Sequence, residues 1–171
     1  MLNMLNHSLD LHKMVAGVYQ IKNERIEIVH LLSNIINQFK VFANEKSVKI
    51  HLYIEENPAA FSDSVYINGE LRYFEMLFEN LLKNAIEASP AEKIVTIQIF
   101  KGEDHTLVSL HNFGVIPEHI RNNFFELYAT SGKKNGSGIG TYSAKLIVEA
   151  HGGKITFSTS ENEGTTLKVL L

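Results

Sequence analysis

Residues 70–88 carry a long helical repeat of apolar side chains, and this repeat limits the possible folds more than any other feature. The apolar positions recur every three or four residues, which places them on one face of a helix. They are Phe74, Leu77, Phe78, Leu81, Leu82, Ala85 and Ile86. A face of this kind is buried against a second layer, so the pattern predicts a helix packed within a layered domain.

The rest of the chain reads as alternating short strands and helices. Helical repeats cover residues 2–15, 31–44 and about 139–150, and strand-like alternation covers 25–29, 48–54, 95–100, 106–110, 154–160 and 165–171. Two pairs of strands read as hairpins that turn at residues 102–104 and near Gly164, and Pro117 opens a short helix. The predicted fold class is α+β: a two-layer sandwich whose mixed, mostly antiparallel sheet carries about three helices on one face.

Composition excludes several classes of function. The 171 residues contain no cysteine, which rules out disulfides, thiolate metal sites and cysteine nucleophiles. The net charge is −3, from 16 basic and 19 acidic residues, so nothing favours nucleic acid or an anionic membrane as a partner. No apolar run is long enough to cross a bilayer, and the first residues lack the pattern of a signal peptide. Any membrane anchor is therefore expected outside this chain.

Two asparagines interrupt the long helix. Asn80 and Asn84 are four residues apart and therefore share a face, which Lys83 and Glu87 flank. Asparagine is an indifferent helix former, and its amide oxygen is a hard ligand that suits Mg²⁺. The same residues are compatible with a solvated polar face, so taken alone they leave both interpretations open.

A glycine-rich turn precedes the helix predicted near residue 139. It reads Gly136-Ser137-Gly138-Ile139-Gly140 and follows two lysines, Lys133 and Lys134. Glycines let the backbone come close to a ligand, and the start of a helix offers free N–H groups to a phosphate. Taken alone, the turn is equally compatible with a flexible loop that carries solvated lysines.

Two further turns complete the set. In the segment 112–117, the amide of Asn112 suits an adenine edge, and Gly114 lets the base approach. The second turn is Gly164-Thr165-Thr166, within the last hairpin. Each is by itself compatible with an ordinary turn.

In their order and spacing, these four features resemble the catalytic ATP-binding domain of sensor histidine kinases. That domain belongs to a superfamily shared with the gyrase B subunit, heat-shock chaperones and mismatch-repair ATPases. The resemblance covers residues 21–171, and residues 1–20 resemble the tail of a dimerisation helix with its linker. The resemblance implies a kinase domain that binds ATP and Mg²⁺ and lies in the cytoplasm, either in a soluble kinase or as the cytoplasmic part of a membrane-bound sensor.

The resemblance also assigns residues. Residues 78–85 look like the asparagine box of the family, which implies that Asn84 is the Mg²⁺ ligand and that Asn80 and Lys83 act in catalysis. Residues 124–128 look like the phenylalanine box that flanks the ATP lid. The implied ATP-binding residues are Asn84, Asn112, Gly114, Ile116, Lys133, Lys134, Gly136, Ser137, Gly138, Ile139, Gly140 and Thr165.

Two departures from the family pattern bear on function. The first glycine box usually begins with aspartate, and here Asn112 stands in its place. None of the eight histidines has the neighbouring acidic residue and following proline of a phosphoacceptor. The acceptor histidine is therefore expected upstream, on a dimerisation domain of a longer, homodimeric kinase that serves a response regulator, whereas this piece alone is expected to be a monomer.

Two alternatives remain open from the sequence. An anti-sigma-factor-type serine kinase shares the nucleotide site and has no dimerisation histidine. A nucleotide-regulated interaction module without catalysis is compatible with the altered adenine box. The Asn80/Asn84 pair and the second glycine box argue against this module, because folding alone does not demand them.

Overall fold

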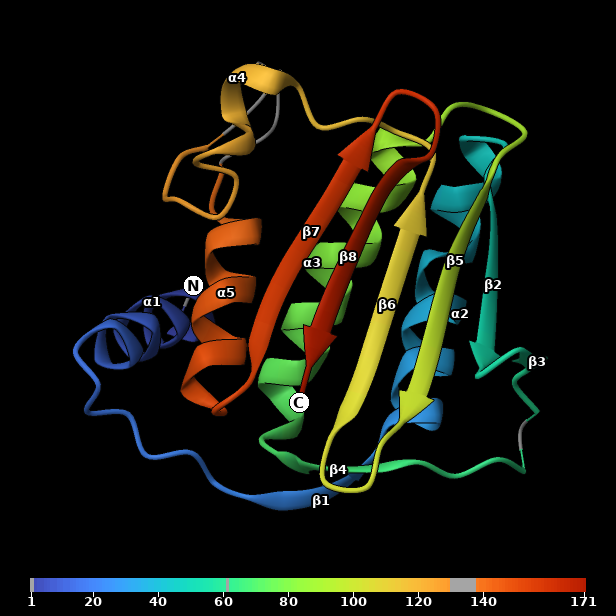
Figure 1. The fold of residues 1–171 in the computed structure, drawn as a ribbon. Helices are drawn as coiled ribbons and strands as arrows, with labels where there is room; N and C mark the ends of the chain where they lie inside the picture. The colour runs from blue at the N-terminus through green and yellow to red at the C-terminus, as the bar shows by residue number, and fades with distance from the viewer. Residues whose placement is uncertain (1, 61, 130–137) are drawn as a thin grey trace.

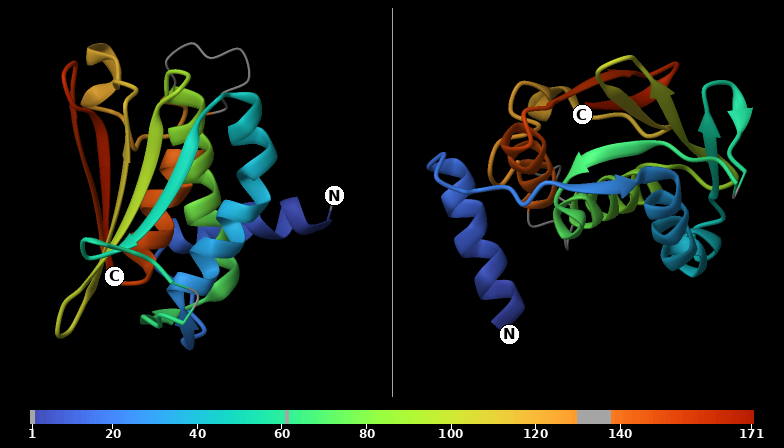
Figure 2. Two further views of the ribbon diagram at one scale, coloured as in Figure 1. Left: turned by 90° about the vertical axis from the view of Figure 1, so that its right-hand side faces the viewer. Right: turned by 90° about the horizontal axis from the view of Figure 1, so that it is seen from below.

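The structure is a computed structural model that describes residues 2–60, 62–129 and 138–171, with side chains of the first helix from Leu9 onward. It has two layers, a six-stranded sheet and three helices that cover one of its faces (Figures 1 and 2). The strands are, in spatial order, β3 (Asn57–Pro58), β2 (Lys49–Ile54), β5 (Ile94–Lys101), β6 (Thr106–Asn112), β8 (Gly164–Leu170) and β7 (Lys154–Ser160). Strands β2 and β5 pair in parallel, and the other neighbours are antiparallel. The predicted α+β sandwich is confirmed.

Three long helices form the second layer, with α3 between the other two (Figure 1). They are α2 (Ile28–Glu45), α3 (Leu71–Ala88) and α5 (Gly140–Ala150), and a single turn, α4 (Glu118–Arg121), follows Pro117. The apolar face of α3 is buried as predicted, and Asn80 and Asn84 are half-buried at its flank. The helix ends at Ala88 because Ser89 is extended, as expected for a residue that precedes a proline, here Pro90. The core thus fixes the face that the two asparagines present.

The strand predicted over residues 25–29 has different bounds. Strand β1 spans Glu24–Glu27 and pairs with β4 (Tyr66–Gly69), which the sequence pattern did not predict. Ile28 and Val29 instead begin α2, because the Glu27 carboxylate caps this helix by accepting hydrogen bonds from the Val29 and His30 amides at 3.0 and 2.6 Å. The cap overrides the alternation of apolar side chains.

The first helix, α1 (Leu2–Val15), packs against α5, and its first residues extend away from the sandwich (Figure 2). A group of polar side chains holds it there, which we call the Arg72 clasp: Asp10, Tyr19, Glu70, Arg72 and Tyr73. Its carboxylates are largely enclosed, with 14% of the Asp10 side chain and 8% of the Glu70 side chain exposed. Burial raises the pKa of Asp10, but the Tyr73 hydrogen bond and two neighbouring cations outweigh burial and lower the pKa.

His151 ties the end of α5 to the beginning of α3. Its Nδ1 lies 2.7 Å from the Ile147 carbonyl, which can only accept, and its Nε2 accepts from the Glu70 amide at 3.2 Å. The ring lies 4.4 Å from that of Phe74, measured between centroids. These contacts select the neutral imidazole, and burial accordingly lowers the pKa of His151.

Within the described ranges, no helix is long and apolar enough to span a bilayer.

Candidate nucleotide-binding site

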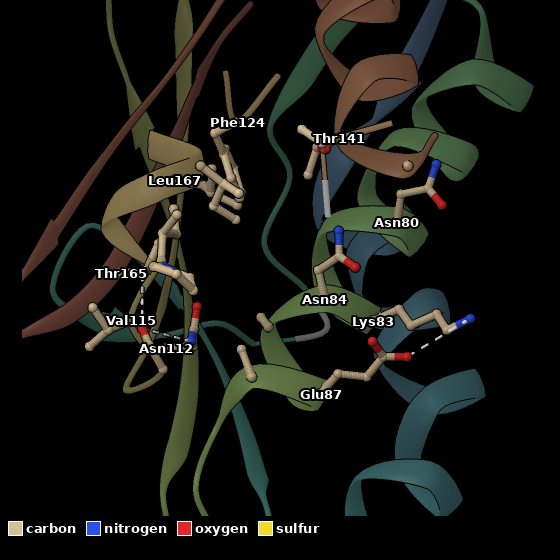
Figure 3. A pocket seen from close by; sticks show the side chains of 18 of the residues that line it. Asn80, Lys83, Asn84, Glu87, Asn112, Val115, Phe124, Thr141, Thr165 and Leu167 are labelled. Atoms are coloured by element: carbon tan, nitrogen blue, oxygen red, sulfur yellow. Dashed lines mark hydrogen bonds and ion pairs between the residues drawn. The ribbon is translucent and has the colours of Figure 1, made fainter. Parts of the chain in front are cut away.

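A pocket of about 240 Å³ opens between the second half of α3 and strands β6 and β8, with the start of α5 at its rim (Figure 3). Nine of the residues predicted from the sequence line it: Asn80, Lys83, Asn84, Asn112, Gly114, Ile116, Gly138, Gly140 and Thr165. They come from four separate parts of the chain. The fold therefore brings the four sequence features together at one site.

The remaining predicted site residues divide into two groups. Ile139 is 42% exposed and lies outside the pocket lining. Its neighbours Gly138 and Gly140 both line the pocket, so the turn presents its glycine backbone rather than this side chain. Lys133, Lys134, Gly136 and Ser137 lie outside the described residues.

The helical wall of the pocket carries the polar side chains of α3. Asn80 lies next to the start of α5: a Cβ added at Gly140 would be 3.5 Å from the Asn80 amide oxygen. Lys83 and Glu87 form a long ion pair of 4.0 Å on the same side of the helix (Figure 3). The wall thus offers two amides, an ammonium and a carboxylate. The described residues contain no group of three or more histidine, aspartate or glutamate side chains that could hold a metal ion by themselves.

The opposite wall is formed by the ends of β6 and β8. Asn112 and Thr165 are directly opposite each other in the two strands, and only 3% and 4% of them is exposed. The Thr165 hydroxyl donates to the Gly114 carbonyl at 2.8 Å, and the Asn112 Nδ2 donates to the same carbonyl at 3.4 Å. Figure 3 shows both bonds and the Asn112 amide oxygen on the pocket side. This wall therefore offers an oriented acceptor within a largely apolar surface.

Two glycines permit this arrangement by close packing of the backbone. A side chain at Gly114 would overlap the carbonyl of Ala88 at the end of α3. Gly164 has a φ of +79°, and a side chain there would overlap the carbonyl of Asn112. Glycine at position 114 thus brings the segment after β6 against α3, and glycine at 164 brings β8 against β6.

Several pocket residues were not predicted as ligand-binding. They include the apolar side chains of Val115, Ile120, Phe124 and Leu167, and the hydroxyl of Thr141. The sequence contains a signal for Leu167, because residues two apart on a strand share a face and Thr165 belongs to the predicted site. The position of Ile120 in the turn after Pro117 gave no such signal.

Residues 69–171 match the family described as histidine kinase-, DNA gyrase B-, and HSP90-like ATPase. The match covers more than half of the chain and includes every residue that lines the pocket. The chain belongs to this family. Its membership confirms the resemblance to an ATP-binding catalytic domain that the motifs indicated.

Relatives and solved structures agree with this family. Sensor histidine kinase WalK of Bacillus subtilis (strain 168) is 28% identical, over 100% of this chain and 28% of WalK. The histidine kinase AdeS of Acinetobacter baumannii has a TM-score of 0.77 at 15% identity, over 99% of this chain and 76% of that chain. Full-length ShkA, solved in complex with AMPPNP, has a TM-score of 0.78 at 18% identity, over 99% of this chain and 35% of that chain. The chain thus spans less than a third of the length of WalK and shares its fold with the two solved kinases.

Proposed function

We propose that this chain is the ATP- and Mg²⁺-binding catalytic domain of a two-component sensor histidine kinase. In this proposal it transfers the γ-phosphate of ATP to a histidine on a dimerisation domain. The observation that carries the proposal is the convergence of Asn80, Asn84, Asn112, Gly140 and Thr165 on one pocket. In a chain of this ATPase family, one side of the pocket suits a purine base and the other suits phosphates.

The adenine is assigned to the wall of Asn112 and Thr165, and the phosphates to the start of α5. Among the residues that the structure describes, no side chain caps the first turn of α5, and the start of a helix offers backbone N–H groups to an anion. Val115, Ile116 and Leu167 supply apolar surface at the other end, as a purine ring requires. The two ends of the pocket therefore match the two ends of ATP.

Magnesium is assigned to Asn84. The fit rests on the donor set, since one neutral amide oxygen suits a cation that keeps several waters and binds substrate phosphates. When bound there, Mg²⁺ would neutralise charge on the phosphates. Asn84 orients these groups, while the α5 amides bind them from the other side.

Asn80 and Lys83 are assigned to positioning of the reacting end. An amide does not take up a proton near neutral pH, so Asn80 acts by orientation and not as a base. Lys83 contributes positive charge at the rim, where its ion pair with Glu87 is long and exposed. Phosphoryl transfer depends mostly on such positioning and charge neutralisation.

The acceptor and its surroundings complete the proposal. Residues 1–20 are proposed to be the end of a dimerisation helix with its linker, and residues 21–171 the catalytic domain. The full protein is proposed to be a homodimer that acts, through its phosphohistidine, on a response regulator. Its kinase domain is proposed to lie in the cytoplasm. WalK, whose similarity to this chain covers 100% of the chain, is itself named as a sensor histidine kinase.

Titration calorimetry of the chain with AMPPNP, with and without Mg²⁺, is the direct test of the nucleotide site. Binding that strengthens with Mg²⁺ is expected. Absence of binding at millimolar nucleotide contradicts the site and favours an interaction module. A second assay mixes the chain with a separate histidine-bearing dimerisation domain and labelled ATP, where labelled phosphohistidine is the expected product and labelled serine on a partner supports an anti-sigma-type kinase.

A further inference from the structure

Three residues lie in a row across three neighbouring strands beneath the pocket. In the sheet register, Asn112 of β6 is opposite Thr165 of β8, which is opposite Thr159 of β7. Residues directly opposite each other project from the same face of a sheet, so the three side chains are neighbours. The hydroxyls of Thr159 and Thr165 are 2.9 Å apart. Thr159 itself lies outside the pocket lining.

The hydrogen bonds of this row have only one possible direction. The Ile116 amide can only donate, and it donates to the Thr159 hydroxyl at 3.1 Å. The Gly114 carbonyl can only accept, and it accepts from Thr165 at 2.8 Å. The proton of Thr165 is therefore committed to Gly114, so the proton between the two threonines must come from Thr159. The chain of donors runs from Ile116 through Thr159 and Thr165 to the Gly114 carbonyl.

The Gly114 carbonyl, at the end of this chain of donors, also determines how the Asn112 amide is oriented. The Gly114 carbonyl also faces the Asn112 amide, and only its NH₂ group can donate to this oxygen. The Asn112 Oδ1 is thereby turned to the pocket side (Figure 3), and no described residue donates to it. Aspartate at this position would turn a second oxygen toward the Gly114 carbonyl, without a proton between them. The row thus makes a neutral asparagine act purely as an acceptor toward the pocket.

We propose that Thr159 is a positioning residue for base selection: it holds the segment 114–116 and Thr165 so that Asn112 presents only its oxygen to the base. The proposal rests on the proposed function, because it names the feature of the nucleotide that this site selects. An acceptor favours the 6-amino group of adenine and disfavours the 6-oxo group of hypoxanthine or guanine, which presents a second acceptor. Without the Thr159 hydroxyl, the Ile116 amide loses its acceptor and the Thr165 hydroxyl loses a donor, so the Gly114 carbonyl between them is held less firmly. The orientation of the Asn112 amide, which depends on this carbonyl, is then less strictly held.

The test compares three triphosphates that differ at purine position 6, on the wild-type chain and on variants of β7; the inosine base also carries a proton on N1. ATP has an amino group, inosine triphosphate an oxygen, and purine riboside triphosphate a hydrogen. Thr159→Val removes the hydroxyl and keeps the shape of the side chain, whereas Thr159→Ser keeps the hydroxyl and removes the methyl group. Thr156→Val makes the same chemical change at an exposed position of the same strand. Titration calorimetry gives the affinities, and thermal melting shows whether each variant is folded.

Thr159→Val is expected to lower the ratio of ATP to inosine triphosphate affinity by about 3- to 10-fold, as for one lost oriented hydrogen bond. Affinity for purine riboside triphosphate is expected to stay unchanged, and Thr159→Ser and Thr156→Val are expected to keep the wild-type ratio. An unchanged ratio in Thr159→Val, or an equal loss for all three nucleotides, overturns the proposal. If Thr159→Val does not fold, Thr159→Ala is measured in its place. Failure of the wild-type chain to bind any triphosphate contradicts the proposed function itself, which separates the two outcomes.

Discussion

The guanidinium Nη2 of Arg72 lies 2.6 Å from the hydroxyl of Tyr19, and this contact joins the segment after α1 to the first turn of α3. The same guanidinium donates through Nε to Glu70 at 2.6 Å and through Nη2 to Asp10 at 3.3 Å. A single side chain therefore connects the first helix, the linker and the helix that carries the pocket asparagines. Its surroundings raise the pKa of Arg72: burial opposes this rise, but the hydrogen bonds to Glu70 and Tyr19 outweigh it.

Arg72→Ala is expected to release α1 from the sandwich. The substitution leaves the enclosed carboxylate of Glu70 without its cation and leaves Asp10 with Lys13 alone, which costs about 1–3 kcal/mol of the free energy of unfolding. Urea denaturation measures this loss, and hydrogen exchange of residues 9–19 reports the release. Lys13→Ala is the control, because Lys13 pairs with Asp10 at 3.4 Å with 57% of its side chain exposed, and it is expected to cost less than about 1 kcal/mol. Equal effects of the two variants contradict the importance of the clasp.

The neutral state of His151 predicts a loss of stability in mild acid. An unfolded histidine has a pKa of about 6.5, and burial lowers the pKa of His151 in the folded chain. As the pH falls below about 6.5, the unfolded chain binds the proton first, so the free energy of unfolding decreases until the pH passes the folded pKa. Denaturation at pH 8 to 5 is expected to show a smaller decrease in His151→Gln than in wild type. His105→Gln, on the exposed turn after β5, is expected to behave as wild type, and identical pH profiles for all three chains contradict the prediction.

Gly140 and Gly114 allow folding and binding to be separated. A methyl group at Gly140 makes only ordinary contact with Asn80 at 3.5 Å, and glycine-to-alanine changes in a helix stabilise it by up to about 1 kcal/mol. Gly140→Ala is therefore expected to keep or raise the melting temperature, while the methyl group crowds the phosphate end and weakens AMPPNP by about tenfold. In Gly114→Ala the new methyl group overlaps the Ala88 carbonyl, and this variant is expected to lower both the melting temperature and the affinity for AMPPNP. Full AMPPNP affinity in a stable Gly140→Ala protein would place the phosphates elsewhere.

The two asparagines of α3 are expected to differ in their effects. Asn84→Ala is predicted to abolish Mg²⁺-dependent binding of AMPPNP, whereas Asn80→Ala is predicted to reduce phosphoryl transfer more than binding. Both side chains are half-buried at the edge of the core, so neither change is expected to unfold the chain. Asn44→Ala, on the exposed face of α2, controls for the loss of an asparagine from a helix. Normal Mg²⁺-dependent binding by Asn84→Ala would refute the assignment of the metal.

Sequence patterns predicted the long elements of this fold better than the short ones. The apolar repeat of α3 runs for five turns, and its buried face leaves one arrangement possible. Strand β4 has four residues and β3 has two, which is too short for alternation to be distinguished from chance. At Ile28 and Val29, alternation continued into residues that belong to a helix, because the Glu27 cap decided the boundary.

The candidate site follows the same division. Asn80, Asn84 and the glycines were predicted because their motifs are local, and they line one pocket. Ile139 was assigned with its turn, although its side chain lies outside the lining. Thr159 gave no signal, because its connection to Asn112 depends on the register of three strands that are distant in sequence. Side-chain positions that depend on such pairing require the structure.

The parallel pairing of β2 with β5 has a consequence for folding. Residues 55–93 join these two strands, and they include α3, so the helix with Asn80 and Asn84 is itself the crossover between them. Pairing across such a connection is nonlocal and is therefore expected late and slowly along the folding pathway. The wall of the pocket and the middle of the sheet are then gained and lost in one cooperative event. A nucleotide held by this wall is expected to stabilise the whole sandwich against global unfolding, and not merely to quieten a surface loop.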